Sequence, residues 1–107
     1  QDQNLLQFFL NMVEFGMTVQ KAVEAPNFNT NQLFLSLGGP DRKPKPGSIL
    51  VNESTPAWIR KELMQMGYRL TFDDRTSGPV NAIFFDWKHG SFWGGSSNHG
   101  EDYGIGW

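Results

Sequence analysis

The residues that could do chemistry are few, and the first group lies near the end of the chain. His99 is followed by Glu101 and Asp102, so an imidazole stands near two carboxylates, and both are metal-ligand types. Their spacing matches no defined ligand pattern, and a polar loop with internal hydrogen bonds explains the same residues. We therefore predict no metal site and no cofactor.

The other titratable side chains offer little for acid–base catalysis. Asp73 and Asp74 are adjacent, and adjacent residues of a strand point to opposite faces of a sheet. Asp86 precedes a tight turn that contains His89, where an exposed polar residue is usual. Solvated turn residues are the simpler interpretation of all four side chains.

Glycine pairs and aromatic rings are the remaining candidates. Gly38-Gly39 and Gly94-Gly95 supply flexible backbone that could cradle an anion, but neither pair directly precedes a predicted helix. A set of aromatic residues in the last quarter of the chain could form a sugar-stacking platform, although alternation along strands would turn some rings into the core. These are Trp87, Phe92, Trp93, Tyr103 and Trp107. No nucleophile elbow, P-loop or zinc-protease motif is present. These residues alone do not make an active site.

Composition narrows the function classes. The chain has 107 residues and a formal net charge of -2, which suits a single domain and gives no electrostatic case for binding nucleic acid. It has no cysteine, so disulfides and thiolate chemistry are excluded. No apolar run approaches the roughly 20 residues of a membrane span.

The elements that must position these residues begin with a helix over 3–15. Its apolar residues leave only a narrow polar stripe of Asn4, Gln7, Asn11 and Glu14, so we expect cover on most sides, as for an inner layer of a larger body. Gly16 predicts the helix end. A short second helix follows over 19–25, with Thr18 as its N-cap and Pro26 after it.

The rest of the chain predicts strands and one more helix. A short strand is expected at 33–37, a solvated loop over 38–48 and a strand at 49–51. Thr55 followed by Pro56 predicts a helix start, and Gly67 its end. Strands follow at 69–74, at 80–87 with cover on both faces, and at 91–97 as the return of a hairpin. The fold class is α+β, with helices packed on an antiparallel sheet.

The order of several segments resembles the gamma-glutamyltranspeptidase family. The segments are LLQFFLNMVEFGM, TVQKAVEAPNF, MGYRL, AIFFDWKHGSFWGGSS and YGIGW. The resemblance covers essentially the whole chain and corresponds to the C-terminal end of that family's small subunit, with features of its cephalosporin-acylase-like branch. It implies that residues 1–107 are a single incomplete domain of a four-layer αββα sandwich, the fold of N-terminal-nucleophile hydrolases.

The resemblance also implies an activity and its partners. In this family a precursor cleaves itself, and the new first residue of the small subunit, usually Thr, attacks a γ-glutamyl amide such as glutathione. A Gly-Gly pair just before the first helix contributes to the oxyanion hole. The partners implied are the large subunit, the N-terminal part of the small subunit and a small γ-glutamyl or acyl amide substrate.

For this chain, the resemblance implies a scaffold. Gln1 is not Thr, Ser or Cys, so the chain contains no catalytic residue and is expected to begin a few residues past the oxyanion donors. Its first helix and the following turn would hold that loop in position. Gln1, Asp2 and Gln3 are the candidates for residues near the substrate, and helix capping by Asp2 is the alternative.

One departure leaves the substrate class open. Many members carry Ser-Asp-Pro-Arg where this chain has Ser96-Ser97-Asn98-His99, so transpeptidase, γ-glutamyl hydrolase and β-lactam side-chain acylase all remain possible. A non-enzymatic ligand-binding module that uses the aromatic, Gly-rich hairpin is the alternative function, and an inactive structural homologue is another. The resemblance implies a periplasmic or secreted location. We also expect the isolated chain to be unstable or to aggregate.

Overall fold

The computed structural model describes residues 2–32, 43–99 and 103–104. Contacts group the chain into two compact units, Gln1–Ala25 with Ser77–Trp107, and Pro26–Thr76. The predicted strand at 33–37 and residues 38–42 of the predicted loop at 38–48 lie outside the described residues. Among the helices described, none has the length and apolar character that crossing a membrane requires.

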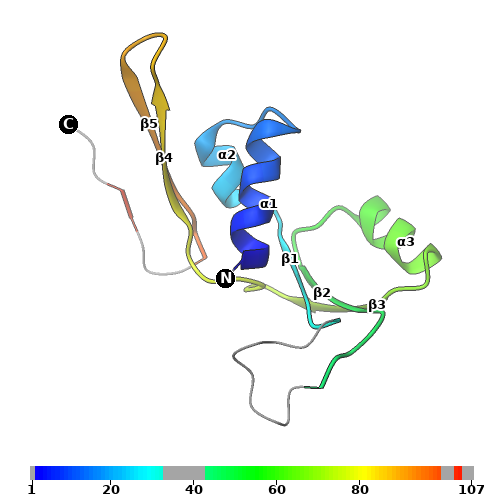
Figure 1. Ribbon diagram of the computed structural model, residues 1–107. Helices are drawn as coiled ribbons and strands as arrows, with labels where there is room; N and C mark the ends of the chain where they lie inside the picture. Colours follow the sequence, from blue (N-terminus) through cyan, green and yellow to red (C-terminus); the bar gives the residue numbers. More distant parts are fainter. Residues whose placement is uncertain (1, 33–42, 100–102, 105–107) are drawn as a thin grey trace. The chain divides into compact units, whose positions relative to one another are not determined.

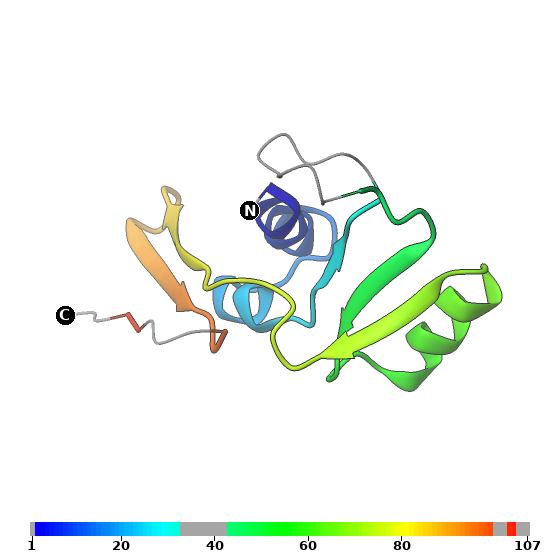
Figure 2. The same ribbon diagram turned by 90° about the horizontal axis from the view of Figure 1, so that it is seen from below.

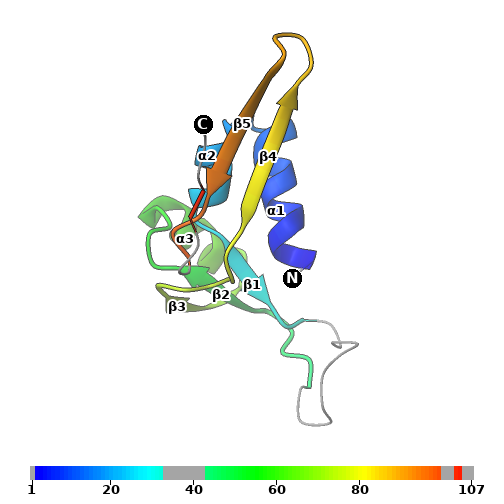
Figure 3. The same cartoon turned by 90° about the vertical axis from the view of Figure 1, so that its left-hand side faces the viewer.

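The first unit consists of two helices and a β-hairpin (Figure 1). Its elements are α1 (Asp2–Val13), α2 (Val19–Glu24), β4 (Asn81–Asp86) and β5 (Ser91–Ser96). The two strands pair antiparallel, with Phe85 opposite Phe92 and Asn81 opposite Ser96. Both helices lie on the same side of the hairpin (Figure 3), and α2 contacts both strands. The predicted hairpin is confirmed.

Helix α1 ends at the predicted glycine. Gly16 has a positive φ of 63°, a conformation that costs glycine little and other residues more. The backbone N–H of Phe15 bonds the Leu10 carbonyl at 3.3 Å, and the N–H of Met17 bonds the Asn11 carbonyl at 3.0 Å. These bonds reach back five and six residues, so the helix widens as it closes and its last carbonyls are still satisfied.

Helix α2 is short, but it supplies most of the core of this unit. The predicted N-cap is confirmed: Thr18 is extended, and its hydroxyl accepts a hydrogen bond from the Lys21 N–H at 3.4 Å. Val19, Ala22 and Val23 are all buried. Because α2 is only six residues long, tertiary packing rather than intrinsic helix propensity must hold it.

The second unit is a small three-stranded sheet with one helix. Its elements are β1 (Phe28–Thr30), β2 (Ser48–Asn52), α3 (Ala57–Gln65) and β3 (Arg69–Asp73), in strand order β1-β2-β3. β1 pairs antiparallel with β2, whereas β2 and β3 are parallel. Figure 2 shows α3, in green, alongside β3. The α+β class is confirmed, but antiparallel pairing was the wrong prediction for β2 and β3, because the intervening helix returns the chain in the same direction.

The start of α3 lies one residue later than predicted. Pro56 is the N-cap, and no described side chain caps the helix. Thr55 is instead buried in a tight turn: its N–H bonds the Asn52 carbonyl at 3.0 Å, and its carbonyl accepts from Arg60 Nε at 2.7 Å. Gly67, with a φ of 94°, follows the end of the helix as predicted.

The hydrophobic cores are thin. The buried apolar residues are Val19, Ala22, Val23 and Val80 in the first unit and Ile49 and Val51 in the second. No large side chain among the described residues is completely buried. Small aliphatic residues therefore form the two cores, and most of the described aromatic rings stay at the surface.

Candidate functional site

The residues predicted to lie near a substrate are at the start of α1. Gln1 lies outside the described residues. Asp2 is exposed in the first helical turn, where a carboxylate interacts favourably with the helix dipole. Gln3 is half-buried, and its carbonyl accepts a hydrogen bond from Gln7 Nε2 at 2.9 Å. The helix-terminal role of Asp2 fits this placement, and a role for the three residues at a substrate stays a prediction.

Three of the four residues of the polar stripe of α1 face the rest of its unit, whereas the fourth, Glu14, is exposed. Asn4 Nδ2 donates to the Gly78 carbonyl at 3.2 Å, and Asn11 Nδ2 donates to the Ala22 carbonyl at 3.5 Å. Gln7 and the two asparagines are half-buried. Hydrogen bonds to loop and helix carbonyls therefore fix which side of α1 faces α2 and the segment before β4.

The opposite side of α1 is apolar and bare. No residue of the helix is buried, and the exposed fractions of five apolar side chains run from 37% to 58%. They are Leu5, Leu6, Phe9, Leu10 and Val13. An exposed apolar surface of this kind normally marks an interaction site. We name these five residues the α1 outer face.

The hairpin has one face that α2 contacts, on which Phe84 and Trp93 are nevertheless exposed, and one bare face. Gly95 lies against α2: a Cβ built there would be 2.8 Å from Val19 Cγ1 and 3.0 Å from the Val19 carbonyl carbon. Gly95 is therefore needed for close approach of the helix, rather than for the anion cradle that the glycine pair could have formed. Neither described helix of this unit covers the other face (Figures 1 and 3), although the apolar run had predicted cover on both.

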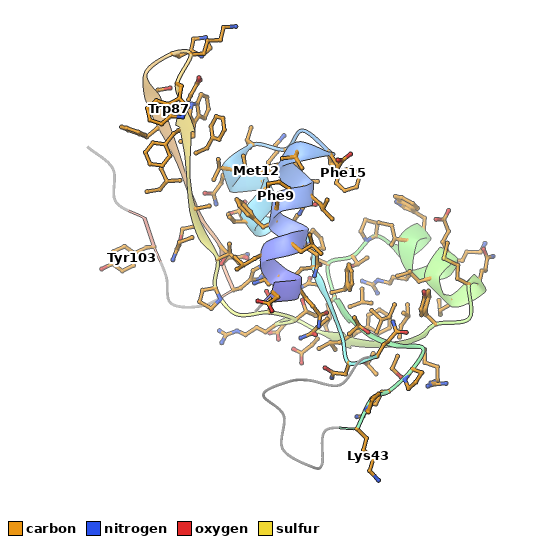
Figure 4. The ribbon with its side chains drawn as sticks, viewed as in Figure 1. Phe9, Met12, Phe15, Lys43, Trp87 and Tyr103 are labelled. Carbon is orange, nitrogen blue, oxygen red and sulfur yellow. The ribbon has the colours of Figure 1, made fainter. Side chains whose placement is uncertain are left out.

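The bare hairpin face carries a cluster of aromatic rings. Phe85 stacks with Trp87 at a centroid distance of 5.8 Å and meets Phe92 edge-on at 4.9 Å. Trp87 lies near the hairpin turn (Figure 4) and is 87% exposed. We name Ile83, Phe85, Trp87 and Phe92 the hairpin outer face, with Ile83 assigned to it by strand alternation.

The structure brings only part of the predicted aromatic platform together. Trp87 and Phe92 are neighbours through Phe85, which the prediction from sequence did not include. Trp93 pairs with Phe84 and so points to the opposite face. Tyr103 is on a separate exposed segment (Figure 4), and Trp107 lies outside the described residues.

Asp86 and His89 form the hairpin turn, as predicted. One carboxylate oxygen of Asp86 accepts the backbone N–H groups of Lys88 at 3.1 Å and His89 at 3.2 Å. The other is 2.7 Å from His89 Nδ1. The carboxylate is thus occupied by the turn, which Gly90 completes with a φ of 64°, and His89 stays exposed.

Asp73 is a turn residue as well. Its carboxylate accepts the Arg75 backbone N–H at 3.0 Å. This bond, followed by a side-chain hydrogen bond with Asp74, lowers the pKa of Asp73 below its ordinary value. The exposed, ionised carboxylate therefore has a structural role, in agreement with the solvated turn that the sequence predicts.

His99 differs from its predicted setting. It is 8% exposed, and its Nε2 has no hydrogen-bond partner among the described residues, so the histidine is buried rather than part of a solvated loop. Glu101 and Asp102 lie outside the described residues, as does the Gly38-Gly39 pair. Within the described part of the chain, no group of three side chains could hold a metal ion.

A buried polar cluster in the second unit was missed by the prediction from sequence. Thr76 Oγ1 donates to the carbonyl of Asn27 at 3.3 Å and also contacts its side-chain oxygen. Asn52 donates its backbone N–H to the same carbonyl at 3.0 Å and its Nδ2 to the Asp74 carbonyl at 3.0 Å. Asn27, Asn52 and Thr76 are all buried. The cluster ties the end of β2 to the segments before β1 and after β3.

Comparison with known proteins places the fold. A scan against models of protein families found no match, and a search of curated proteins found none either. Solved structures, in contrast, match with high probability. The neighbours are N-terminal-nucleophile hydrolases, and the α+β fold of this chain is similar to theirs.

Three neighbours illustrate the likeness. An acivicin-inhibited gamma-glutamyltranspeptidase has a TM-score of 0.72 and 25% identity, over 94% of this chain and 48% of its own. LmbA2991HD has a TM-score of 0.78 and 28% identity, over 92% and 18%. Cephalosporin acylase from Bacillus halodurans has a TM-score of 0.74 and 22% identity, over 92% and 16%. These matches confirm the predicted resemblance to gamma-glutamyltranspeptidases and their acylase-like relatives. This chain spans about half the length of the transpeptidase chain that it matches, and less of the others.

Proposed function

We propose that this chain is part of a self-processing N-terminal-nucleophile enzyme that hydrolyses or transfers γ-glutamyl or related acyl groups from small amides. The observation that carries the proposal is the match of 94% of the chain to a gamma-glutamyltranspeptidase at 25% identity. In this role the chain supplies no nucleophile. It scaffolds the loop that precedes α1, whose oxyanion donors act only when they are preorganised.

The partners in this proposal are the large subunit and the N-terminal part of the small subunit of the same precursor. The α1 outer face and the hairpin outer face support it, because both carry apolar side chains that the described part of their own unit leaves exposed. The polar inner side of α1 also supports partners of this kind. The helix cannot rotate about its axis to bury its apolar side chains within the unit without losing its hydrogen bonds to Gly78 and Ala22. In this proposal residues 1–107 are an incomplete domain.

The structure of one neighbour points to the segment after β5. For that transpeptidase, critical roles of its C-terminus in autoprocessing and catalysis are described. We propose the same kind of role for the segment that follows β5 here. A periplasmic or secreted location stays a prediction from the resemblance.

The test starts from the complete protein that contains this chain. Intact mass and N-terminal sequencing of the purified material should reveal a second polypeptide that begins with Thr or Ser. A γ-glutamyl-anilide assay and a β-lactam acylase assay on that material then separate the substrate classes. Replacing the new first residue by Ala is the matched control, and it should abolish both cleavage and turnover.

Two other outcomes would overturn the proposal. If the 107-residue chain is found alone, folded and without turnover, a ligand-binding role for the exposed ring of Trp87 becomes the better explanation. Glycan binding, followed by quenching of tryptophan fluorescence, would support it. If the precursor assembles but its nucleophile position is not Thr, Ser or Cys, the protein is an inactive structural homologue.

A further inference from the structure

The side-chain amide of Gln20 forms hydrogen bonds with the end of β5 in the way that the backbone of a neighbouring strand would. Its Nε2 donates to the Ser96 carbonyl at 2.9 Å, and its Oε1 accepts the Ser96 N–H at 3.2 Å. Both backbone polar groups of one residue are thus paired by a single side-chain amide. The Nε2 of Gln20 also donates to Glu24 Oε1, at 2.7 Å, so a side chain one turn along α2 orients the amide.

The residues on either side of Ser96 are fixed as well. Gly95 lies against the backbone of Val19, because a Cβ placed on Gly95 would be only 3.0 Å from the Val19 carbonyl carbon. Ser97 is 3% exposed, its N–H bonds the Val80 carbonyl at 3.0 Å, and its Oγ accepts the Val80 N–H at 3.0 Å. Three consecutive residues are therefore held by α2 and by the residue that precedes β4.

These contacts set the direction in which the chain leaves β5. We propose that Gln20 is a positioning residue: its amide holds Ser96 and thereby places residues 97–99, which follow β5, for the self-cleavage and acyl transfer proposed above. This inference rests on that proposed function. Gln20 is exposed, so a substitution there leaves the packing of the core unchanged, and the effect of its amide can be measured separately.

The test compares Gln20→Met with Gln65→Met in the complete protein. Methionine keeps the length of the side chain and removes both amide hydrogen-bonding groups. Gln65 is an exposed glutamine on α3, so the control makes the same change on another helix. We expect Gln20→Met to slow self-cleavage and to lower kcat by roughly tenfold to a hundredfold, the range for a small misplacement, with little change in KM. Gln65→Met should match the wild type.

Hydrogen exchange followed by mass spectrometry supplies a second readout that does not depend on activity. Peptides covering 96–99 should exchange faster in Gln20→Met, while peptides from the middle of β4 keep their protection. The proposal would be overturned if self-cleavage, kcat and hydrogen exchange of Gln20→Met were all the same as in the wild type. Faster exchange with wild-type kinetics would also overturn it, because Gln20 would then be a structural contact only.

The two proposals fail in different ways. If the wild-type protein neither cleaves itself nor turns over an acyl amide, the proposed function fails, and with it the catalytic consequence of Gln20. The exchange experiment would still show whether Gln20 holds Ser96.

Discussion

The contact between α2 and β5 makes a sharp prediction about two adjacent glycines. We expect Gly95→Ala to weaken the attachment of α2 to the hairpin, and Gly94→Ala to leave it intact. A Cβ at Gly95 would be 2.8 Å from Val19 Cγ1, 3.0 Å from the Val19 carbonyl carbon and 3.1 Å from the Gln20 nitrogen. A Cβ at Gly94 would have no described neighbour within 4 Å.

The magnitude follows from these distances. Carbon atoms in good contact are about 3.5–4.0 Å apart, so the new methyl group overlaps its neighbours by roughly half an ångström or more. Val19 is 3% exposed and β-branched, so its side chain has little freedom to move. Overpacking of this kind costs about 1–3 kcal/mol. Against this, alanine is favoured over glycine inside a strand by about 0.5–1 kcal/mol. Gly95→Ala should therefore lose up to about 2 kcal/mol of local stability, and Gly94→Ala should be neutral or slightly stabilised.

Native-state hydrogen exchange of the complete protein is the suitable assay. It reports the opening free energy of α2 directly, whereas a global melt of a multi-segment protein is not a two-state transition. The peptide that covers 19–24 should exchange faster in Gly95→Ala and normally in Gly94→Ala. Equal protection of α2 in both variants would refute the close approach of α2 to Gly95.

Three further substitutions test other parts of the structure. Thr76→Val should destabilise the second unit by about 1–3 kcal/mol, because it removes a donor from the buried Asn27 oxygens. The control is Thr71→Val, at an exposed threonine on β3. Peptide-level hydrogen exchange measures the stability of both variants. Asp73→Asn should remove an acid sensitivity. The lowered pKa of Asp73 contributes stability that is present above its ordinary value and is lost as the pH falls through the lower folded-state value. The difference in stability between the wild type and the variant should therefore be constant at higher pH and change only as the pH falls through that range. Phe9→Lys on the α1 outer face should reduce aggregation of the isolated 107-residue chain, measured by light scattering, and should impair assembly of the complete protein. An unchanged yield of assembled protein would show that this face is not an interface.

Local signals in the sequence were sufficient for most of the secondary structure. Gly16 ends α1 with a positive φ, and Thr18 caps α2, because glycine conformation and a hydroxyl cap depend only on neighbouring residues. Thr55 does not cap α3, because the helix starts one residue later, with Pro56 as its N-cap, and Thr55 is buried in the turn before it.

Features that depend on distant residues could not be predicted. The cluster of Asn27 and Thr76 joins positions 49 residues apart, and nothing local in either segment marks it. Gly95 and Val19 are also far apart in sequence, so a glycine needed for packing was indistinguishable from one that could cradle an anion. The parallel pairing of β2 with β3 depends on where α3 returns the chain, which periodicity alone does not give.

The polarity of α1 connects these observations to function. Its narrow polar stripe predicts apolar cover on most sides of the helix. In the structure the stripe is largely half-buried, and the α1 outer face is bare. Burying a large aliphatic or aromatic side chain completely is worth about 1.5–3 kcal/mol, so five half-exposed ones leave about 5 kcal/mol that a partner could supply.

That amount is large compared with the roughly 5–15 kcal/mol of net stability of a whole domain. The two described cores contain only small aliphatic residues, so they offer little to replace it. Assembly with the remainder of the precursor would then both stabilise α1 and fix the position of the loop before it. Under the function proposed above, the residues that would bind the partner and those that would orient the catalytic loop lie on one short helix.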